Sequence, residues 1–338
     1  MNDARRLAVA LAVLASALVA IALAALFVGS AGLSPAAVAR ALTGRAEPAS
    51  VEAIVTLSLR LPRVAVAMLA GAALAVAGVG FQALTRNPLA EPSVLGVSSG
   101  AAFGVVLAQI MGFETGLVAA LGIAVFAFAG ALLAAGVVYL VSTAPGGLAI
   151  QTLLLAGVIV GIFFSAAITV VISIVDFNRL GGVIHWLLGN LSPIPASSLG
   201  LFAALAATGV WLILTSAREL NLLALGEESA RQLGVDAERL KRRVFLAAAL
   251  LTGTVVAFTG PIGFVGLIVP HVLRGLVGHD NRLLVPTALV GGGAFLLAAD
   301  TLARNIVAPA ELSVGVITAF CGAPFFVWVL RGRALRVA

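Results

Sequence analysis

The chain has 338 residues, of which 62% are hydrophobic and only 10% are charged, and its mean hydropathy is +1.17. Soluble domains carry about 25% charged residues, so this composition excludes an ordinary soluble protein and indicates an integral membrane protein. The net charge of +6 comes mainly from arginines at the ends of apolar segments, which is typical of membrane topology rather than of nucleic-acid binding. The single cysteine, Cys321, excludes an internal disulfide and a cysteine metal cluster.

Apolar segments of membrane-spanning length recur along the whole chain. Since a span needs about 20 residues, we predict an all-α integral membrane fold of ten transmembrane helices, in one domain covering residues 1–338. The predicted spans are Leu7–Val28, Val64–Leu84, Val94–Gly112, Leu117–Val141, Thr152–Val175, Ser197–Leu214, Val244–Pro261, Gly263–Val277, Leu284–Ala303 and Val314–Leu330. The first is too long for the apolar core of a signal peptide, so we expect it to be retained.

The distribution of basic residues predicts the orientation of these spans. An even number of spans places both termini on the same side of the membrane. That side carries fourteen of the 20 Lys and Arg residues, and the other side carries six. Because positive charge is enriched on the cytoplasmic side, we predict that both termini are cytoplasmic.

The segment 218–243 is predicted to face the cytoplasm too, and it holds eleven of the chain's 34 charged residues. Gly226 is placed to begin a short helix with acidic residues in its first turn, and Gly234 to end it. Asp236 is a favourable cap for a second helix that runs into the next span. The alternative is a solvated loop that only orients this span. The ordered apolar and small residues of the segment favour a docking surface for a soluble partner.

The outer side carries arginines against the expected bias. A Ser-Pro pair at 34–35 predicts a short helix there, and Arg60 and Arg63 follow directly before a span. Their side chains either extend to the membrane interface or dock an acidic surface of another protein. Further along, Asp300 and Arg304 lie four residues apart on one helix face and are expected to pair.

Glycines recur every fourth residue after a proline-rich turn at Asn87–Pro92. Such spacing leaves one helix face nearly bare and allows close helix packing, which we favour over contact with a substrate. The candidate packing or pathway residues are Gly96, Ser98, Ser99, Gly100 and Gly104. Glycines and prolines also interrupt Gly260–Arg274, which predicts a broken helix.

Two histidines have both structural and functional interpretations. His185 stands beside Trp186, and a residue of the aromatic belt is favoured over a ligand. His271 is favoured as a structural residue or a contact of the cytoplasmic partner. It is not expected to bind metal, because no second His, Cys or carboxylate lies at ligand spacing.

The chain lacks residues that could bind ATP or carry a coupling ion. It has no Ser-His-Asp or HExxH arrangement, and its one lysine, Lys241, is outside any P-loop pattern. Ion-coupled carriers need titratable residues within the membrane, and the spans have almost none away from their ends. We therefore expect no cofactor in this chain, and if the protein moves a solute uphill, the energy must come from another chain.

Eight ordered motifs resemble one family of transport proteins. They are RLPR (60–63), GAALAVAG (71–78), RNPLAEP (86–92), LGVSSGA (95–101), LLLAGV (153–158), LALGEESARQLGV (223–235), GPIGFVGLIVPHVLR (260–274) and VGVITAFCGAPFFVWVL (314–330). In this series the chain resembles the FecCD-type permease subunits of ABC importers for ferric siderophores, haem and cobalamin. The resemblance covers nearly the whole chain.

The resemblance implies a cobalamin-permease-like type II importer fold in a bacterial inner membrane. It further implies a homodimer with the translocation pathway on the dimer axis. Two cytoplasmic ATPase subunits, which bind ATP and Mg²⁺, and a periplasmic or lipid-anchored substrate-binding protein would complete the transporter. The segment before the second cytoplasmic helix is similar to the coupling helices of the family, which seat in a groove of each ATPase. The implied coupling residues are Leu225, Gly226, Glu227, Glu228, Ser229, Ala230, Arg231, Gln232, Leu233 and Gly234.

In this family, outer arginines pair with glutamates of the binding protein, and the matching positions are Arg60, Arg63 and Arg304. The resemblance therefore favours docking for these arginines. Two other classes of protein stay open: a secondary carrier, which would need buried titratable groups, and a structural scaffold, which would not need the broken helix. Within the family, the substrate alternatives are a siderophore, haem, cobalamin or an oxyanion such as molybdate.

Overall fold

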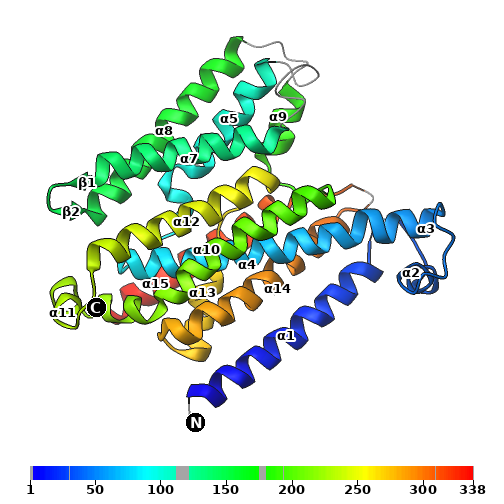
Figure 1. Ribbon diagram of the computed structural model, residues 1–338. Helices are drawn as coiled ribbons and strands as arrows, with labels where there is room; N and C mark the ends of the chain where they lie inside the picture. Colours follow the sequence, from blue (N-terminus) through cyan, green and yellow to red (C-terminus); the bar gives the residue numbers. More distant parts are fainter. Residues whose placement is uncertain are drawn as a thin grey trace.

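The computed structural model describes residues 3–29, 31–111, 122–174, 180–192, 194–308 and 310–337. Within these ranges the chain is almost entirely helical (Figure 1), and η1 is a π-helix and η2 a 3₁₀-helix. The elements are α1 (Asp3–Phe27), α2 (Pro35–Leu42), α3 (Val51–Ala53), η1 (Ile54–Arg60), α4 (Leu61–Thr85), η2 (Pro92–Leu95), α5 (Val97–Met111), α7 (Ile123–Ser142), β1 (Thr143–Ala144), β2 (Gly147–Leu148), α8 (Ile150–Ile174), α9 (Leu180–Leu187), α10 (Ala196–Leu223), α11 (Glu227–Gln232), α12 (Ala237–Thr259), α13 (Val265–Val277), α14 (Asn281–Asn305) and α15 (Val314–Val337).

Helix α4 is the centre of the larger group of helices, and α10, α12, α13 and α14 pack around it (Figure 1). Two of these contacts depend on glycine. A Cβ on Gly71 would clash with the carbonyl oxygen of Gly292 in α14, and one on Gly78 would clash with that of Gly266 in α13. Backbones approach this closely only where side chains are absent, as in small-xxx-small interfaces.

A second group consists of α5, α7 and α8, which lie above α12 in Figure 1. Gly100 of α5 and Gly130 of α7 each contact the other's backbone, so the predicted packing role of the glycine series is confirmed for Gly100. Gly96 packs closely too, since a Cβ there would lie 3.1 Å from the carbonyl oxygen of Gly157 in α8. It does so from the turn that ends η2, with a φ of 73°, rather than from the face of α5.

Eight helices of the described residues are long and apolar enough to cross a membrane. Two shorter apolar helices, Val97–Ala108 and Val265–Val277, lie at two further predicted spans. All ten predicted segments are therefore represented by helices. That the two shorter helices also cross the membrane stays a prediction.

Two span boundaries differ from the predictions. Helix α4 continues from α3 and η1 as one helix over Val51–Thr85, so it begins well before the predicted Val64. Pro62 does not break it, because the π-helix η1 ends just before it and the helix already departs there from regular α-helical hydrogen bonding. Helix α10 runs on to Leu223 rather than ending at Leu214, which places the charged residues at 218 and 219 on a helix.

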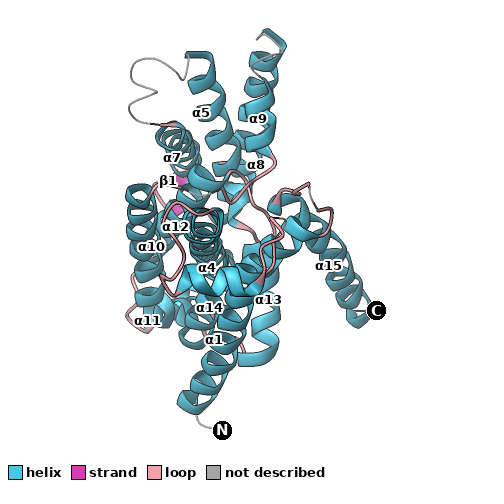
Figure 2. Cartoon of the chain, turned by 90° about the vertical axis from the view of Figure 1, so that its right-hand side faces the viewer, coloured by secondary structure: helices cyan, strands magenta, loops and turns pink. Residues whose placement is uncertain are grey.

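The two termini lie at the same end of the bundle as α11, and α2 and α3 lie at the opposite end (Figure 1). This agrees with an even number of crossings. Helix α15 stands apart from the main bundle (Figure 2) and exposes Phe320 and Trp328, while α8 exposes Phe163. Such exposed apolar faces suit lipid or a second protein chain in the membrane.

Candidate functional site

The predicted coupling segment folds as two helices joined at a glycine turn. Helix α11 begins after Gly226, whose φ is 114°, and α12 is capped by Asp236, whose side chain accepts a hydrogen bond from the Arg239 amide. At the end of α11, the amide of Val235 donates to Ala230 and that of Gly234 to Arg231. This is a Schellman motif, which needs the left-handed Gly234 (φ 85°). The helix start, glycine turn and cap predicted for this segment are confirmed.

Helix α11 presents apolar side chains outside the bundle. Ala230 is fully buried and anchors the helix, whereas Leu225 and Leu233, at either end of it, are 66% and 58% exposed. Both lie beyond the long apolar helices, where water rather than lipid is the expected solvent. Two leucines held in this way by a rigid turn form a surface suited to a partner groove.

The one lysine of the chain lies directly beneath α11. Lys241 of α12 is only 4% exposed, and its Nζ donates to the Leu148 carbonyl at 2.9 Å. The same Nζ forms ion pairs with Glu227 of α11, at 2.5 Å, and with Glu238. Glu238 in turn accepts a hydrogen bond from the Leu148 amide at 2.8 Å. One ammonium group therefore joins α11, α12 and the β1–β2 hairpin.

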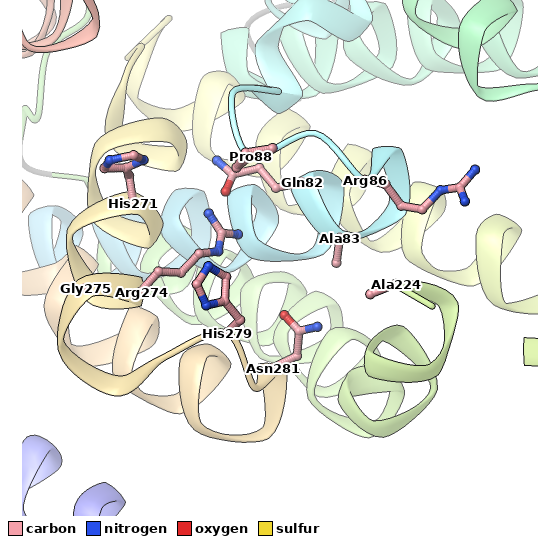
Figure 3. Close-up of a pocket in the computed structure, with 10 residues that line it drawn as sticks. All are labelled: Gln82, Ala83, Arg86, Pro88, Ala224, His271, Arg274, Gly275, His279 and Asn281. Carbon is pink, nitrogen blue, oxygen red and sulfur yellow. The ribbon is translucent and has the colours of Figure 1, made fainter. Parts of the chain in front are cut away.

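A cavity of about 600 Å³ opens beside this region, between the ends of α4 and α13 and the start of α14 (Figure 3). Its walls include Gln82, Arg86, Arg274 and His279, and none of the described residues that line it is acidic. In Figure 3, Arg274 extends toward Gln82 and His279, whereas Arg86 points away from them. The cavity is therefore basic and favours acidic groups.

The predicted docking arginines meet at the opposite end of the bundle. Arg60, Arg63 and Arg304 all line one cavity of about 200 Å³ together with Glu311. Asp300 lies beneath it, fully buried, and pairs with Arg63 at 3.0 Å and with Arg304 at 3.1 Å. The predicted pairing of Asp300 with Arg304 is thus confirmed. The fold brings residues from η1, α4 and α14 to one place.

These arginines are less exposed than expected for residues at a membrane edge. Arg60 is 5% exposed and donates to the Leu26 carbonyl at 2.6 Å, and Arg304 is 4% exposed. Arg63 also pairs with Glu311 at 2.7 Å, and the Glu311 side chain is 40% exposed. Three positive and two negative charges leave the cluster with a formal charge of +1. An added carboxylate would neutralise it.

The predicted pathway residues fall into two environments. Gly96 and Ser99 line an open groove of about 510 Å³ together with Gly161, Ser165 and Thr169 of α8. The backbone at 100 and 104 instead packs against α7, and Ser98 is partly buried. Hydroxyl groups and glycine backbone line the groove together with the apolar Val94, Val158 and Ile162.

The profile of the FecCD transport family matches residues 17–332. The chain belongs to this family. The hemin transport system permease protein HmuU of Yersinia pestis is 44% identical over 283 residues, which cover 83% of this chain and 84% of HmuU. The cobalamin import system permease protein BtuC of Halobacterium salinarum is 43% identical over 279 residues, 82% of this chain and 74% of that protein.

A solved structure has the same fold as this FecCD chain. It is an inward-facing conformation of a metal-chelate type ABC transporter, 30% identical in sequence, with a TM-score of 0.81 over 98% of this chain and 99% of the other. The relatives and the structure are therefore ABC transporter permeases. The chain is a multi-pass membrane protein of this transport class, with the type II importer fold.

Some predicted residues of the FecCD chain stay unassigned. The side chain of His185 and the residues from Asp176 to Arg179 lie outside the described residues. His271 packs edge-on against Phe325 of α15, with ring centroids 5.6 Å apart. Among the described residues, no three His, Cys, Asp or Glu side chains gather as metal ligands would.

Two residues of the site were missed in the sequence. Glu91 accepts a hydrogen bond at 2.5 Å from the amide of Phe264, which has a left-handed φ of 67° just before α13. Lys241 contacts Leu148, which is 93 residues away. Neither partner follows from local spacing. The one signal for Lys241 was that it is the only lysine in an arginine-rich chain.

Proposed function

We propose that two copies of this chain form the membrane pathway of an ABC importer, driven by ATPase subunits at the α11 end and loaded by a substrate-binding protein at the α2 end. The α11 end is then cytoplasmic, as are both termini, and the membrane is the bacterial inner membrane. The exposed leucines of α11 carry the proposal, because they offer a partner a firm apolar surface outside the bilayer.

The ATPase contact extends beyond α11. The basic cavity of Figure 3 adjoins α11 through Ala224, which lines it. A partner that receives Leu225 and Leu233 in an apolar groove and places acidic groups near Arg274 would match both surfaces. Such complementary charge mainly fixes orientation and partner choice. ATP binding would then move α11 and switch the pathway between its outward and inward openings.

The charge of the outer cluster supports docking of a binding protein. With a formal charge of +1, the group of Arg60, Arg63, Arg304, Asp300 and Glu311 is completed by a single carboxylate from a partner. Glu311, the most exposed carboxylate of the group, is the one that such a partner would displace from Arg63.

The groove on α8 supports a pathway shared between two copies. Ser165 and Thr169 are exposed beside Gly161, among the apolar Val158 and Ile162, and hydroxyl groups in a membrane are better placed toward water or protein than toward lipid. The exposed apolar residues of α8 and α15 would flank it against the second copy. Weak binding here leaves selectivity to the binding protein.

The proposed substrates are haem, a cobalamin or a ferric siderophore, since the relatives named above carry haem and cobalamin. The test uses proteoliposomes that contain this chain, the ATPase of its transport system and the cognate binding protein. ATP should drive uptake of one of the three substrates. Sustained accumulation by the isolated chain would contradict the proposal.

The α11 surface is tested by replacing Leu225 and Leu233 with aspartate. Both side chains are exposed, so the fold should persist, while the ATPase subunit should no longer co-purify. A matched control is Leu246→Asn, on the apolar stretch of α12, whose exposed side chain (52%) lies away from α11. Retention of the ATPase by the double aspartate variant would show that α11 is not the contact.

A further inference from the structure

We infer that Lys241 transmits the movement of α11 to the β1–β2 hairpin, and through the hairpin to the pathway helix α8. The inference rests on the proposed function, because it supposes that an ATPase displaces α11. It assigns a positioning role to a residue that touches neither the partner surface nor the groove.

The first step is the contact between α11 and Lys241. Glu227 opens α11, and its carboxylate lies 2.5 Å from the Lys241 Nζ. Ala230 also anchors α11 to the bundle, but by apolar packing, which permits sliding. The ion pair is directional and moves with the first turn of the helix. A displacement of α11 therefore acts on the buried ammonium group.

The second step is the contact between Lys241 and the hairpin. Leu148 is held by both of its backbone groups, since its carbonyl accepts from Lys241 at 2.9 Å and its amide donates to Glu238 at 2.8 Å. The fit leaves no room, because a Cβ on the neighbouring Gly147 would clash with the Glu238 carboxylate. The hairpin is thereby fixed to the start of α12 and to the ammonium group.

The third step is the path from the hairpin to the groove. Helix α8 begins at Ile150, two residues after Leu148, and its Gly161, Ser165 and Thr169 line the 510 Å³ groove. A helix moves as a rigid element over this length. A shift of Leu148 therefore moves the α8 wall of the groove. The hairpin also follows directly on α7, which packs against α5, so part of the displacement reaches the α5 wall as well.

The chemistry of the cluster argues against a purely stabilising role. A buried ammonium group costs desolvation, and apolar replacements of buried ion pairs are often neutral or stabilising. Lys241→Met alone leaves the two carboxylates facing each other without their counter-charge, so it should lower stability. The double variant that also removes the Glu227 carboxylate relieves this repulsion, so coupling is compared well below the unfolding midpoint of each variant.

The experiment uses the complete transporter in proteoliposomes, with Lys241→Met, Lys241→Arg and the control Arg239→Met. Arg239 lies on the same helix turn, is 69% exposed and pairs only loosely with Asp236, at 3.7 Å. In Lys241→Met we expect the ATPase to stay bound and to hydrolyse ATP at the basal rate, while substrate uptake per ATP falls about 5- to 150-fold. The unfolding midpoint of Lys241→Met should decrease, and that of the double variant without the Glu227 carboxylate should decrease less. Lys241→Arg should restore much of the coupling, and Arg239→Met should match the wild type.

A double-variant cycle tests the first step. Glu227→Ala removes the α11 partner and leaves the hairpin contacts in place. If Lys241 and Glu227 act as one link, the double variant should couple no worse than Lys241→Met alone. If the losses of coupling in the two single variants multiply in the double variant, the two residues act independently and the inference is overturned. Normal coupling in Lys241→Met would also overturn it, and so would a variant that loses ATPase binding together with its stability. If the wild-type complex shows no ATP-driven uptake, the proposed function itself fails.

Discussion

Arg63 and Asp300 are 237 residues apart in the sequence, yet Asp300 accepts three hydrogen bonds from the Arg63 guanidinium group. The pair joins α4 to α14, the two helices whose glycines also meet at Gly71 and Gly292. Asp300 is fully buried and serves Arg304 as well. A single carboxylate thus holds two of the three arginines proposed to dock the binding protein.

Asp300→Ala should strongly destabilise the protein, because it leaves two mostly buried guanidinium groups without their shared partner. Loss of one member of a buried ion pair typically costs about 3–5 kcal/mol, and unfolding of the purified protein in detergent measures it. Glu52→Ala is the control at the same end, since the Arg40–Glu52 pair is exposed and should contribute at most about 1 kcal/mol. Equal effects of the two substitutions would refute the structural role of Asp300.

An apolar replacement of Arg63, Arg304 and Asp300 separates folding from docking. The triple variant Arg63→Met, Arg304→Met, Asp300→Leu removes these three charges, keeps similar volumes and leaves Arg60 and Glu311 in place, so its stability should be near that of the wild type. Stimulation of ATP hydrolysis by the binding protein should be lost, while basal hydrolysis persists. Undiminished stimulation would show that the binding protein docks elsewhere.

Gly78→Ala should destabilise the α4–α13 contact. The added methyl group would clash with the backbone of Gly266, which cannot move aside as a flexible side chain could. Overpacking of this kind costs about 1–3 kcal/mol. Gly136→Ala is the matched control, since a Cβ there meets no atom within 4 Å. Thermal unfolding of the two variants provides the comparison, and similar midpoints would contradict the close approach.

Glu91 gives a prediction about pH. Burial raises its pKa above the usual 4.5 despite the hydrogen bond from Phe264. The folded state therefore keeps a proton that the unfolded state has lost, and the free energy of unfolding should decrease as the pH rises from about 4.5 through the raised value.

Two substitutions of Glu91 separate charge from hydrogen bonding. Glu91→Gln retains an acceptor for the Phe264 amide and should abolish the pH dependence of this group. Glu91→Ala leaves the amide unsatisfied at the start of α13 and should cost about 1–3 kcal/mol at any pH. Unfolding curves between pH 4 and pH 8 measure both effects. A pH dependence that survives in Glu91→Gln would assign it to another group.

The contribution of Asp280 to the pH dependence of stability should have the opposite sign to that of Glu91. The Arg282 guanidinium group, with further hydrogen bonds from the Arg282 amide and Asn221, lowers the pKa of Asp280 from 3.8 to about 2. Its contribution to stability is present above about pH 4 and should be lost as the pH falls toward 2. The Asp280→Asn variant should not show this loss of stability when its unfolding is measured over the same pH range. The prediction would be contradicted if the wild type and the variant lost stability equally at low pH.

The sequence predicted those parts of the fold that local chemistry determines. Apolar length located the spans, and glycine and aspartate at fixed offsets located α11 and the start of α12, because helix ends need left-handed or capping residues. The second span was predicted to begin at Val64, whereas the helix begins at Val51, because the π-helix η1 continues it outward ahead of Pro62.

The site was predicted only in part, for a physical reason. Exposed surfaces such as Leu225 and Leu233 follow from a local pattern. The partners of Asp300, Glu91 and Lys241 lie far away in sequence, and their pairing depends on helix packing. Arg60 was expected at an exposed edge, but η1 turns it toward the carbonyl of Leu26.

The helix Val51–Thr85 has 35 residues, which corresponds to a length of about 50 Å, against a hydrocarbon core of about 30 Å. A helix of this length extends beyond the bilayer, and α2 lies beside its outer turns. Its other end stops at the wall of the basic cavity, where Gln82 and Arg86 lie. A protein that binds beside α2 would therefore contact a helix that continues to the far side of the bundle, and η1 with Pro62 is a place in that helix where bending is expected.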